Sequence, residues 1–190
     1  MKSKPLLWQL LPVNLLIIIG ALLALVWFGS ATLRDLFFDH MRNDLEARAR
    51  LIEATVVNLL RVSPQELQPY CRQLGRQSGS RITVIDPDGK VLADSREDPA
   101  KMSNHADRPE IRAALTGRIG MNLRFSNTMG EDMYYVAIPL TSENAQELGA
   151  LRLAASAGSV VQTMRLMNLK IILGGLLFLI LAALASLLVS

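Results

Sequence analysis

The chain has 190 residues, a formal net charge of +3 and a single cysteine. All 17 acidic residues and 18 of the 20 basic residues lie between residues 34 and 170, so this middle part is almost neutral. Its basic and acidic residues are interleaved, which excludes the clustered positive face of a nucleic-acid-binding domain. One cysteine excludes an internal disulfide and a thiolate metal site, and two well-separated histidines give no metal-ligand pattern.

Two apolar stretches flank the middle part. No charged residue occurs between residues 5 and 33 or between residues 171 and 190. Each stretch is long enough to cross a hydrocarbon layer of about 30 Å as a helix. Trp8 and Trp27 lie about 28 Å apart on such a helix, which suits the two membrane interfaces. We predict membrane helices over residues 8–33 and 166–190; a cleaved signal peptide is the alternative for the first stretch.

The charges of the short N-terminal tail predict the orientation. Residues 1–7 carry only positive charge, from Lys2 and Lys4, so this tail should be cytoplasmic. Residues 34–165 then form an extracytoplasmic domain of a two-pass protein of the plasma (inner) membrane. The chain stops within an apolar helix without a basic anchor, so we expect the parent protein to continue.

The first membrane helix should run on without a break to about residue 60. Apolar residues recur there at alternating spacings of four and three, as in a coiled-coil seam. This stripe consists of Leu45, Ala49, Ile52, Val56 and Leu59. It fits two interpretations equally well: the stripe packs on the domain's own sheet, or it pairs with the same helix of a second copy.

The remaining pattern predicts an α+β domain. A short helix over residues 64–77 precedes two strands, 81–85 and 90–94, joined by a Pro/Gly turn. A helix should follow from Asp107 as N-cap, with Glu110 at the third position, to Thr116. Strands over 121–126, 133–140 and 148–155 then precede the second membrane helix. Hairpin-connected strands with helices between them favour one five-stranded antiparallel sheet.

No catalytic motif occurs, so we assign no catalytic residue, no cofactor and no metal ligand. Residues 102–110 (MSNHADRPE) are dense in hydrogen-bonding groups and precede a helix, and Arg124, Ser126 and Tyr135 lie on later strands. Together they suit a pocket for a small carboxylate or other anion. In the alternative, Asn104 and Asp107 only cap, His105 packs under the loop, and Arg108 pairs with an acid such as Asp94.

Three strings carry a resemblance to a known family: RITVIDPDGKVLADSREDPAKMSNHADRPEIRAAL, then GRIG, then LRFSNTMGEDMYYVAIPL. They resemble the extracytoplasmic sensor of phosphate-regulon-type sensor histidine kinases, within the PAS-like, single Cache (PDC) sensor domains shared with chemoreceptors and diguanylate cyclases. The resemblance implies a homodimer through the long N-terminal helix and a ligand pocket near residues 102–108. The pocket positions that it implies are His105, Arg108, Arg124, Ser126, Thr128 and Tyr135.

The leading functional hypothesis is therefore the signal-input module of a two-component sensor histidine kinase. Ligand binding would displace the two terminal helices relative to each other, and a cytoplasmic part beyond these residues would act on a response regulator. One alternative is the input of a chemoreceptor or diguanylate cyclase. Another is a two-span membrane-tethered interaction protein.

Overall fold

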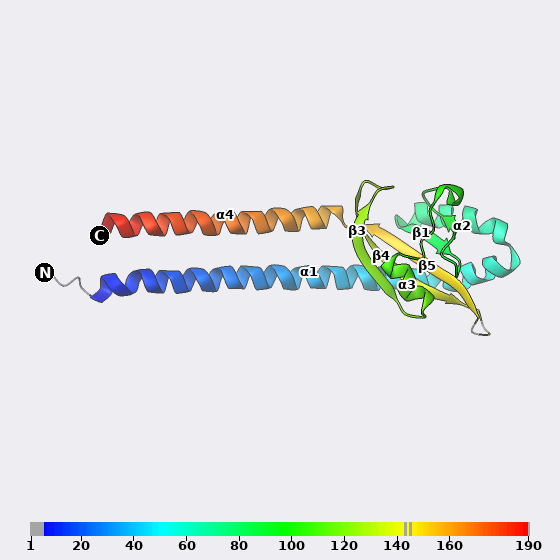
Figure 1. Ribbon diagram of the computed structural model, residues 1–190, viewed down its shortest axis with the longest axis horizontal. Coiled ribbons are helices and arrows are strands. Elements are labelled where there is room, and N and C mark those ends of the chain that lie inside the picture. The colour runs from blue at the N-terminus through cyan, green and yellow to red at the C-terminus, as the bar shows by residue number, and fades with distance from the viewer. Residues whose placement is uncertain (1–5, 143, 145, 190) are drawn as a thin grey trace. The chain divides into compact units, whose positions relative to one another are not determined.

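The computed structural model describes residues 6–142, 144 and 146–189 (Figure 1). It divides into two compact units. One is a domain over residues 38–159, and the other consists of the helical segments before and after it. Most of the expected cytoplasmic tail, residues 1–7, lies outside the described residues.

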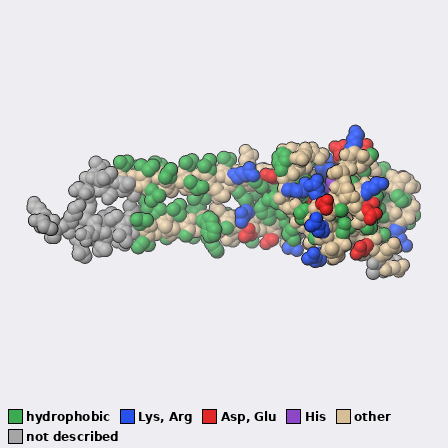
Figure 2. Space-filling model, in the orientation of Figure 1, with side chains coloured by type: hydrophobic (Ala, Val, Ile, Leu, Met, Phe, Trp, Pro, Cys, Tyr) green, Lys and Arg blue, Asp and Glu red, His purple; other side chains and the backbone are tan. Residues whose placement is uncertain are grey.

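The helical unit contains the apolar part of α1 (Leu6–Val62) and nearly all of α4 (Gly158–Val189). Both helices are long and apolar enough to cross a membrane. Their large apolar side chains are exposed, with 65% of Leu16, 67% of Leu25 and 65% of Ile172 accessible (Figure 2). Such surfaces are unfavourable in water and suit lipid, as expected for a membrane protein.

The domain is built on one antiparallel sheet. Its strands are β1 (Arg81–Ile85), β2 (Val91–Asp94), β3 (Gly120–Ser126), β4 (Glu131–Thr141) and β5 (Glu147–Ser156). Their order is β2-β1-β5-β4-β3, with every neighbouring pair antiparallel (Figure 1). The predicted α+β class and five-stranded sheet are confirmed. The long-range pair β1–β5 places the first and last strands side by side at the centre.

Three short helices complete the domain. Pro64 begins α2 (Pro64–Ser78) at a position where no backbone donor is needed, and Gly79 ends it with a left-handed φ of 66°. A short 3-10 turn, η1 (Pro99–Lys101), and α3 (Pro109–Leu115) follow β2. Ile111 and Ala114 of α3 are buried in one apolar cluster with Ile85 of β1 and Val91 of β2.

The part of α1 that belongs to the domain is fixed to it by side chains. Leu45, Ala49 and Val56 are only 1%, 0% and 0% exposed, so they lie in the core of this chain's own domain. The first interpretation of the apolar stripe is thus confirmed for these three residues, and they are not available to a second copy. Ile52 and Leu59 are half-buried. Arg48 donates from Nη1 to the carbonyl oxygen of Ser78 at 2.9 Å, which ties the helix to the end of α2.

Candidate ligand-binding site

A cavity of about 540 Å³ opens in the domain, within the size range of small-molecule sites. All six residues predicted as pocket positions line it: His105, Arg108, Arg124, Ser126, Thr128 and Tyr135. The other lining residues are Arg81, Glu97, Lys101, Met102, Ser103, Phe125, Asn127 and Arg152. Segments far apart in the sequence therefore meet at one place, as the sequence analysis expected.

Strand β3 supplies one wall through its alternation. Arg124 is half-buried and Ser126 is 3% exposed, whereas Met121, Leu123 and Phe125 are 41%, 40% and 57% exposed. Successive side chains of β3 alternate between the two faces of the sheet, and the polar side is the one that faces inward. A strand with polar residues inward is poorly suited to a core but well suited to a polar cavity.

The loop before α3 is held against the β1–β2 turn. The backbone N–H of His105 donates to the carbonyl oxygen of Gly89 at 2.7 Å, and Asn104 Nδ2 donates to the carbonyl oxygen of Asp88 at 2.7 Å. Gly89 has a φ of +84°, and a Cβ there would lie 2.5 Å from Ala106. The turn therefore requires glycine to bring the loop this close. These bonds fix the position of His105 at the cavity.

A buried ion pair lies at the β1 side of the cavity. Arg81 and Asp94 are 4% and 0% exposed, and Arg81 Nε donates to Asp94 Oδ2 at 3.0 Å. The hydroxyl of Thr83 donates to the same oxygen at 2.7 Å. Asp94 is thus the partner of Arg81, and the alternative in which it pairs with Arg108 is wrong.

A second ionic cluster lies between α3, β3 and β5. Glu110 is fully buried, and its Oε1 accepts from Arg152 Nη1 at 3.3 Å and from Arg124 Nη2 at 3.4 Å. The expectation that Asp107 caps α3 with Glu110 at the third position is wrong. Arg108 is the N-cap and makes no side-chain cap bond. Glu110 turns inward because two guanidinium groups attract its carboxylate more strongly than an exposed backbone amide would.

Tyr135 brings the two guanidinium groups together on the cavity wall. Arg124 Cζ lies 4.2 Å and Arg152 Cζ lies 5.0 Å from the centroid of its ring. Cation–π contacts of this kind are stronger when the cation is desolvated, as Arg152 is at 2% exposed. Burial lowers the pKa of Arg152 and the Glu110 carboxylate opposes that shift, but an arginine side chain remains charged in any case.

Several buried polar atoms of this region have no hydrogen-bond partner among the described residues. They are Arg81 Nη2, Arg124 Nε, Arg152 Nε, His105 Nδ1 and Glu110 Oε2. Burial, and next the charge of Arg152, lower the pKa of His105, so its ring is neutral at neutral pH. Unpaired buried donors are rare in folded proteins because each is costly. Arg81, Arg124 and Arg152 each have one such unpaired nitrogen, and all three residues line the same cavity.

The cavity shows binding features and no catalytic arrangement. Within the described residues no group of three His, Cys, Asp or Glu side chains could hold a metal ion. Cys71 is buried in α2, and burial together with the charge of Asp94 raises the pKa of its thiol to about 12, which makes it unreactive.

Sequence reasoning missed the deepest residues of the site. Arg81 and Arg152 lie in otherwise apolar strands, and Glu110 was assigned to a helix cap. The available signal was a single charged residue inside a run of β-forming residues, as in RITVI and GALRLAAS. A charge in a central strand must find a buried partner.

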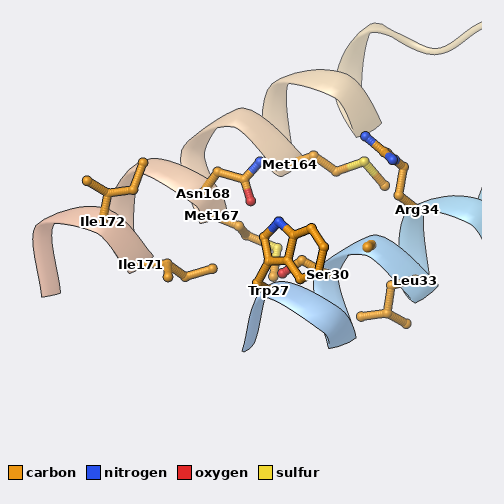
Figure 3. A pocket seen from close by; sticks show the side chains of 10 residues that line it. Trp27, Ser30, Leu33, Arg34, Met164, Met167, Asn168, Ile171 and Ile172 are labelled. Atoms are coloured by element: carbon orange, nitrogen blue, oxygen red, sulfur yellow. The ribbon is translucent and has the colours of Figure 1, made fainter. Parts of the chain in front are cut away.

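A second cavity, of about 510 Å³, lies between α1 and α4 in the helical unit (Figure 3). Most of its lining is apolar and consists of Trp27, Leu33, Met164, Met167, Ile171 and Ile172. Its polar members are Ser30, Arg34 and Asn168. Such a lining suits apolar neighbours in a membrane and gives no indication of a polar ligand.

Solved structures with a similar fold are sensor domains. The sensor domain of the V. cholerae histidine kinase DctB is 21% identical, with a TM-score of 0.53 over 73% of this chain and 58% of that one. The E. coli DcuS sensor domain is 18% identical, with a TM-score of 0.55 over 68% of this chain and 98% of that one. The ligand-binding domain of the Campylobacter jejuni chemoreceptor Tlp3, in complex with 4-methylisoleucine, is 15% identical, with a TM-score of 0.53 over 85% of this chain and 64% of that one.

At these identities the likeness establishes the fold alone. The curated proteins contain no significant match to the chain. A sequence model of the family described as Single Cache-like matches residues 35–155, which is more than half of the chain. This match covers the sheet, α2, α3 and the cavity just described, and it agrees with the sensor folds found among solved structures. The chain therefore belongs to the Single Cache-like family.

Proposed function

We propose that the chain is the extracytoplasmic sensing and transmembrane input part of a two-component sensor histidine kinase, and that a small anion bound in the cavity is its signal. The observation that carries this proposal is the cluster of arginines with unpaired buried donors that lines the cavity of a Single Cache-like domain. A domain that served only as a tether would gain nothing from buried arginines that keep unpaired donors.

The kinase output is supported by two findings. The strings over residues 81–115 and 123–140 resemble phosphate-regulon-type sensor kinases. One of the similar folds is described as the sensor domain of a histidine kinase. The kinase core and the contact with a response regulator would belong to other parts of a longer protein. Chemoreceptor domains share the fold, so a chemoreceptor input is the second candidate.

The proposed topology has two membrane passes. Residues 1–7 would be cytoplasmic, residues 8–33 and 166–190 would cross the membrane, and residues 34–165 would face the outside. The positive N-terminal tail and the two apolar helices support this arrangement. The helix α1 continues without interruption from the apolar segment into the domain, which provides a stiff connection for a displacement of about 1–2 Å.

We further propose a homodimer through α1, but with a different face from the one that the sequence indicated. Three members of the predicted stripe are buried in the domain core. The exposed side of the helix carries Ala47, Leu51, Ala54 and Asn58 at spacings of four, three and four, and Leu51 is 81% exposed. Small alanines at this spacing allow two helices to approach closely around Leu51.

A reporter assay tests the proposal. Residues 1–190 would be joined to the cytoplasmic part of a sensor kinase with a measurable transcriptional output, and small anions would be added to the medium. We expect a dose-dependent change that is lost in Arg124→Gln, because this substitution removes a cavity donor. Arg118→Gln is the matched control, since Arg118 is exposed in the turn before β3. An equal response of Arg124→Gln and wild type would contradict the proposal.

A further inference from the structure

We propose that the apolar face of β3 is a membrane-docking surface, which rests on the phospholipid headgroup layer through Met121, Leu123 and Phe125. This inference rests on the two membrane passes of the proposed function. It adds a direct contact between the domain itself and the bilayer, besides the two helices that lead into it.

The proposed docking surface lies at an edge of the sheet. In the order β2-β1-β5-β4-β3, strand β3 has a neighbour on one side only (Figure 1). Its apolar side chains Met121, Leu123 and Phe125 are 41%, 40% and 57% exposed. Exposed apolar side chains on an edge strand promote aggregation in water. Such a surface therefore requires a cover.

Helix α1 covers the neighbouring strand but leaves β3 open. Leu123 pairs with Tyr134 of β4, so both side chains lie on the same face of the sheet. Tyr134 is only 7% exposed, and the ring of Phe38 in α1 stacks on it with centroids 5.4 Å apart. Val136, which pairs with Met121, is fully buried. The cover that α1 provides thus ends between β4 and β3.

The first connection to the membrane enters the domain beside this surface. Phe38 is the first residue of the domain, and its stacking partner Tyr134 lies directly next to Leu123. The predicted span ends at residue 33, so Phe38 lies about 7.5 Å further along the helix. A headgroup layer extends about 5–8 Å beyond the hydrocarbon. Phe38 is therefore at the outer limit of the headgroups, and Leu123 is one strand away from it.

The second connection leaves the domain at the same end of the sheet. The backbone N–H of Ala157 donates to the carbonyl oxygen of Asp132 at 2.8 Å, and Asp132 pairs with Phe125 of β3. Helix α4 begins at the next residue, Gly158. Two connections to apolar helices hold this end of the sheet close to the bilayer, and the exposed apolar side chains of β3 lie there.

The position and the chemistry of the surface favour lipid over a second copy of the chain. Phenylalanine and leucine are typical of protein surfaces that lie in the membrane interface. The proposed dimer face is centred on Leu51, which lies about 20 Å further along α1 than Phe38. The bilayer is therefore nearer to β3 than the dimer contact is.

The contact is tested with a fluorescent label at residue 123, in the full chain in lipid nanodiscs. Phe125 also borders the cavity, so Leu123 is the better position for a label. Leu123→Cys would carry an environment-sensitive maleimide dye, and the wild type, whose Cys71 is buried, would be the labelling blank. We expect blue-shifted emission and quenching by lipids with a nitroxide on the headgroup.

The control position is Val62, which is an exposed apolar residue far from the membrane connections. It is 70% exposed and lies about 36 Å beyond Phe38 on α1. A label at Val62→Cys should show neither the blue shift nor the quenching. Equal signals from the two positions would contradict a specific docking surface.

A charge placed in the surface distinguishes docking from mere proximity. Phe125→Glu should abolish the blue shift and the quenching at residue 123, because a carboxylate is unfavourable in the interface. Gln73→Glu adds the same charge at an exposed position of α2 and should change neither signal. If Phe125→Glu does not fold, Met121→Glu should have the same effect. Quenching that persists in the folded variant would overturn the docking.

A third label separates this inference from the proposed function. Leu25 is an exposed residue of the first apolar helix, and a label at Leu25→Cys should be quenched by a nitroxide in the acyl chain. If that label is quenched but residue 123 emits as in water, the docking surface is overturned and the topology stands. A blue shift at residue 123 without quenching would assign the surface to a protein partner and overturn the lipid contact. Without quenching at residue 25, the membrane topology itself would be wrong, and this inference with it.

Discussion

Removal of the Asp94 carboxylate should be among the most damaging single changes in the domain. Asp94 is fully buried at the end of β2 and accepts from Arg81 Nε at 3.0 Å and from the Thr83 hydroxyl at 2.7 Å. It also accepts from the backbone amides of Arg96 and Glu97, both at 2.9 Å. One carboxylate therefore satisfies a buried cation and the start of the loop that leads to the cavity.

The size of the effect follows from what Asp94→Ala leaves behind. Arg81 is 4% exposed, so its charge would remain buried without a counter-charge. Breaking a buried ion pair by removing one partner costs about 3–5 kcal/mol in the free energy of unfolding. Asp94→Asn keeps the shape and one acceptor but loses the charge, so its loss should be smaller, about 2 kcal/mol.

The assay is thermal unfolding of the full chain in detergent micelles, followed by near-ultraviolet circular dichroism of tyrosine. All three tyrosines, Tyr70, Tyr134 and Tyr135, lie in the domain, so the tyrosine signal reports on it once the contribution of the two tryptophans outside the domain is subtracted. For a domain of this size we expect Asp94→Ala to lower the Tm by about 10 °C.

The control for this prediction is Asp107→Ala. The Asp107 side chain is fully exposed, and its contact with Arg112 measures 3.7 Å. Exposed pairs of this kind contribute about 0–1 kcal/mol, so the control should unfold almost as wild type does. If Asp94→Ala lost no more stability than Asp107→Ala, the reasoning from buried charge would be refuted.

Three further predictions concern other parts of the domain. Burial lowers the pKa of His105 below its ordinary value of 6.5, so the unfolded chain binds a proton as the pH falls through 6.5 and the folded chain does not. The free energy of unfolding, measured from pH 8 to pH 5, should therefore decrease below pH 6.5. The decrease should be smaller in His105→Gln. Because burial raises the pKa of Cys71 to about 12, maleimide should label the thiol only after unfolding, and rapid labelling of the folded chain at pH 7 would contradict this. A Cβ at Gly120 would lie 1.9 Å from the carbonyl oxygen of Glu110. Gly120→Ala should therefore lower the free energy of unfolding, measured by denaturant titration, by about 1–3 kcal/mol. Gly158→Ala is the control and should change it little, because the nearest atom to a Cβ there is 3.5 Å away.

The fold could be predicted because its signals are local. The turn around Gly89, the proline at the start of α2 and the period-two alternation of β3 each belong to a few consecutive residues. All five predicted strands occur in the structure, with differences of one or two residues at their ends. The pairing of β1 with β5 joins residues about 70 positions apart, and no local pattern predicted it.

The stripe on α1 shows where periodicity is insufficient. A spacing of four and three marks the apolar face of a helix, but it does not distinguish a sheet of the same chain from a second helix as the partner. Burial of Leu45, Ala49 and Val56 identifies the domain core as the partner. The exposed face around Leu51 contains alanines and polar residues, which carry too weak a pattern to be noticed in the sequence.

The inner part of the cavity could not be predicted because its residues are defined by one another. An arginine such as Arg152 is unfavourable in a central strand unless it has a buried carboxylate partner. That partner is Glu110, which lies 42 positions earlier in the sequence. From the sequence alone, Glu110 is predicted to be a helix-cap residue. Only the structure shows that Arg124 and Arg152 bind its carboxylate in the interior. Both guanidinium groups bond to Oε1 of Glu110, whereas Oε2 and the Nε atoms of both arginines have no partner among the described residues. A buried network is most stable when all its members are satisfied, so these unpaired atoms cost the domain stability. Under the proposed function, the missing acceptors would belong to the ligand, and the same shortage that costs the domain stability would favour the bound state.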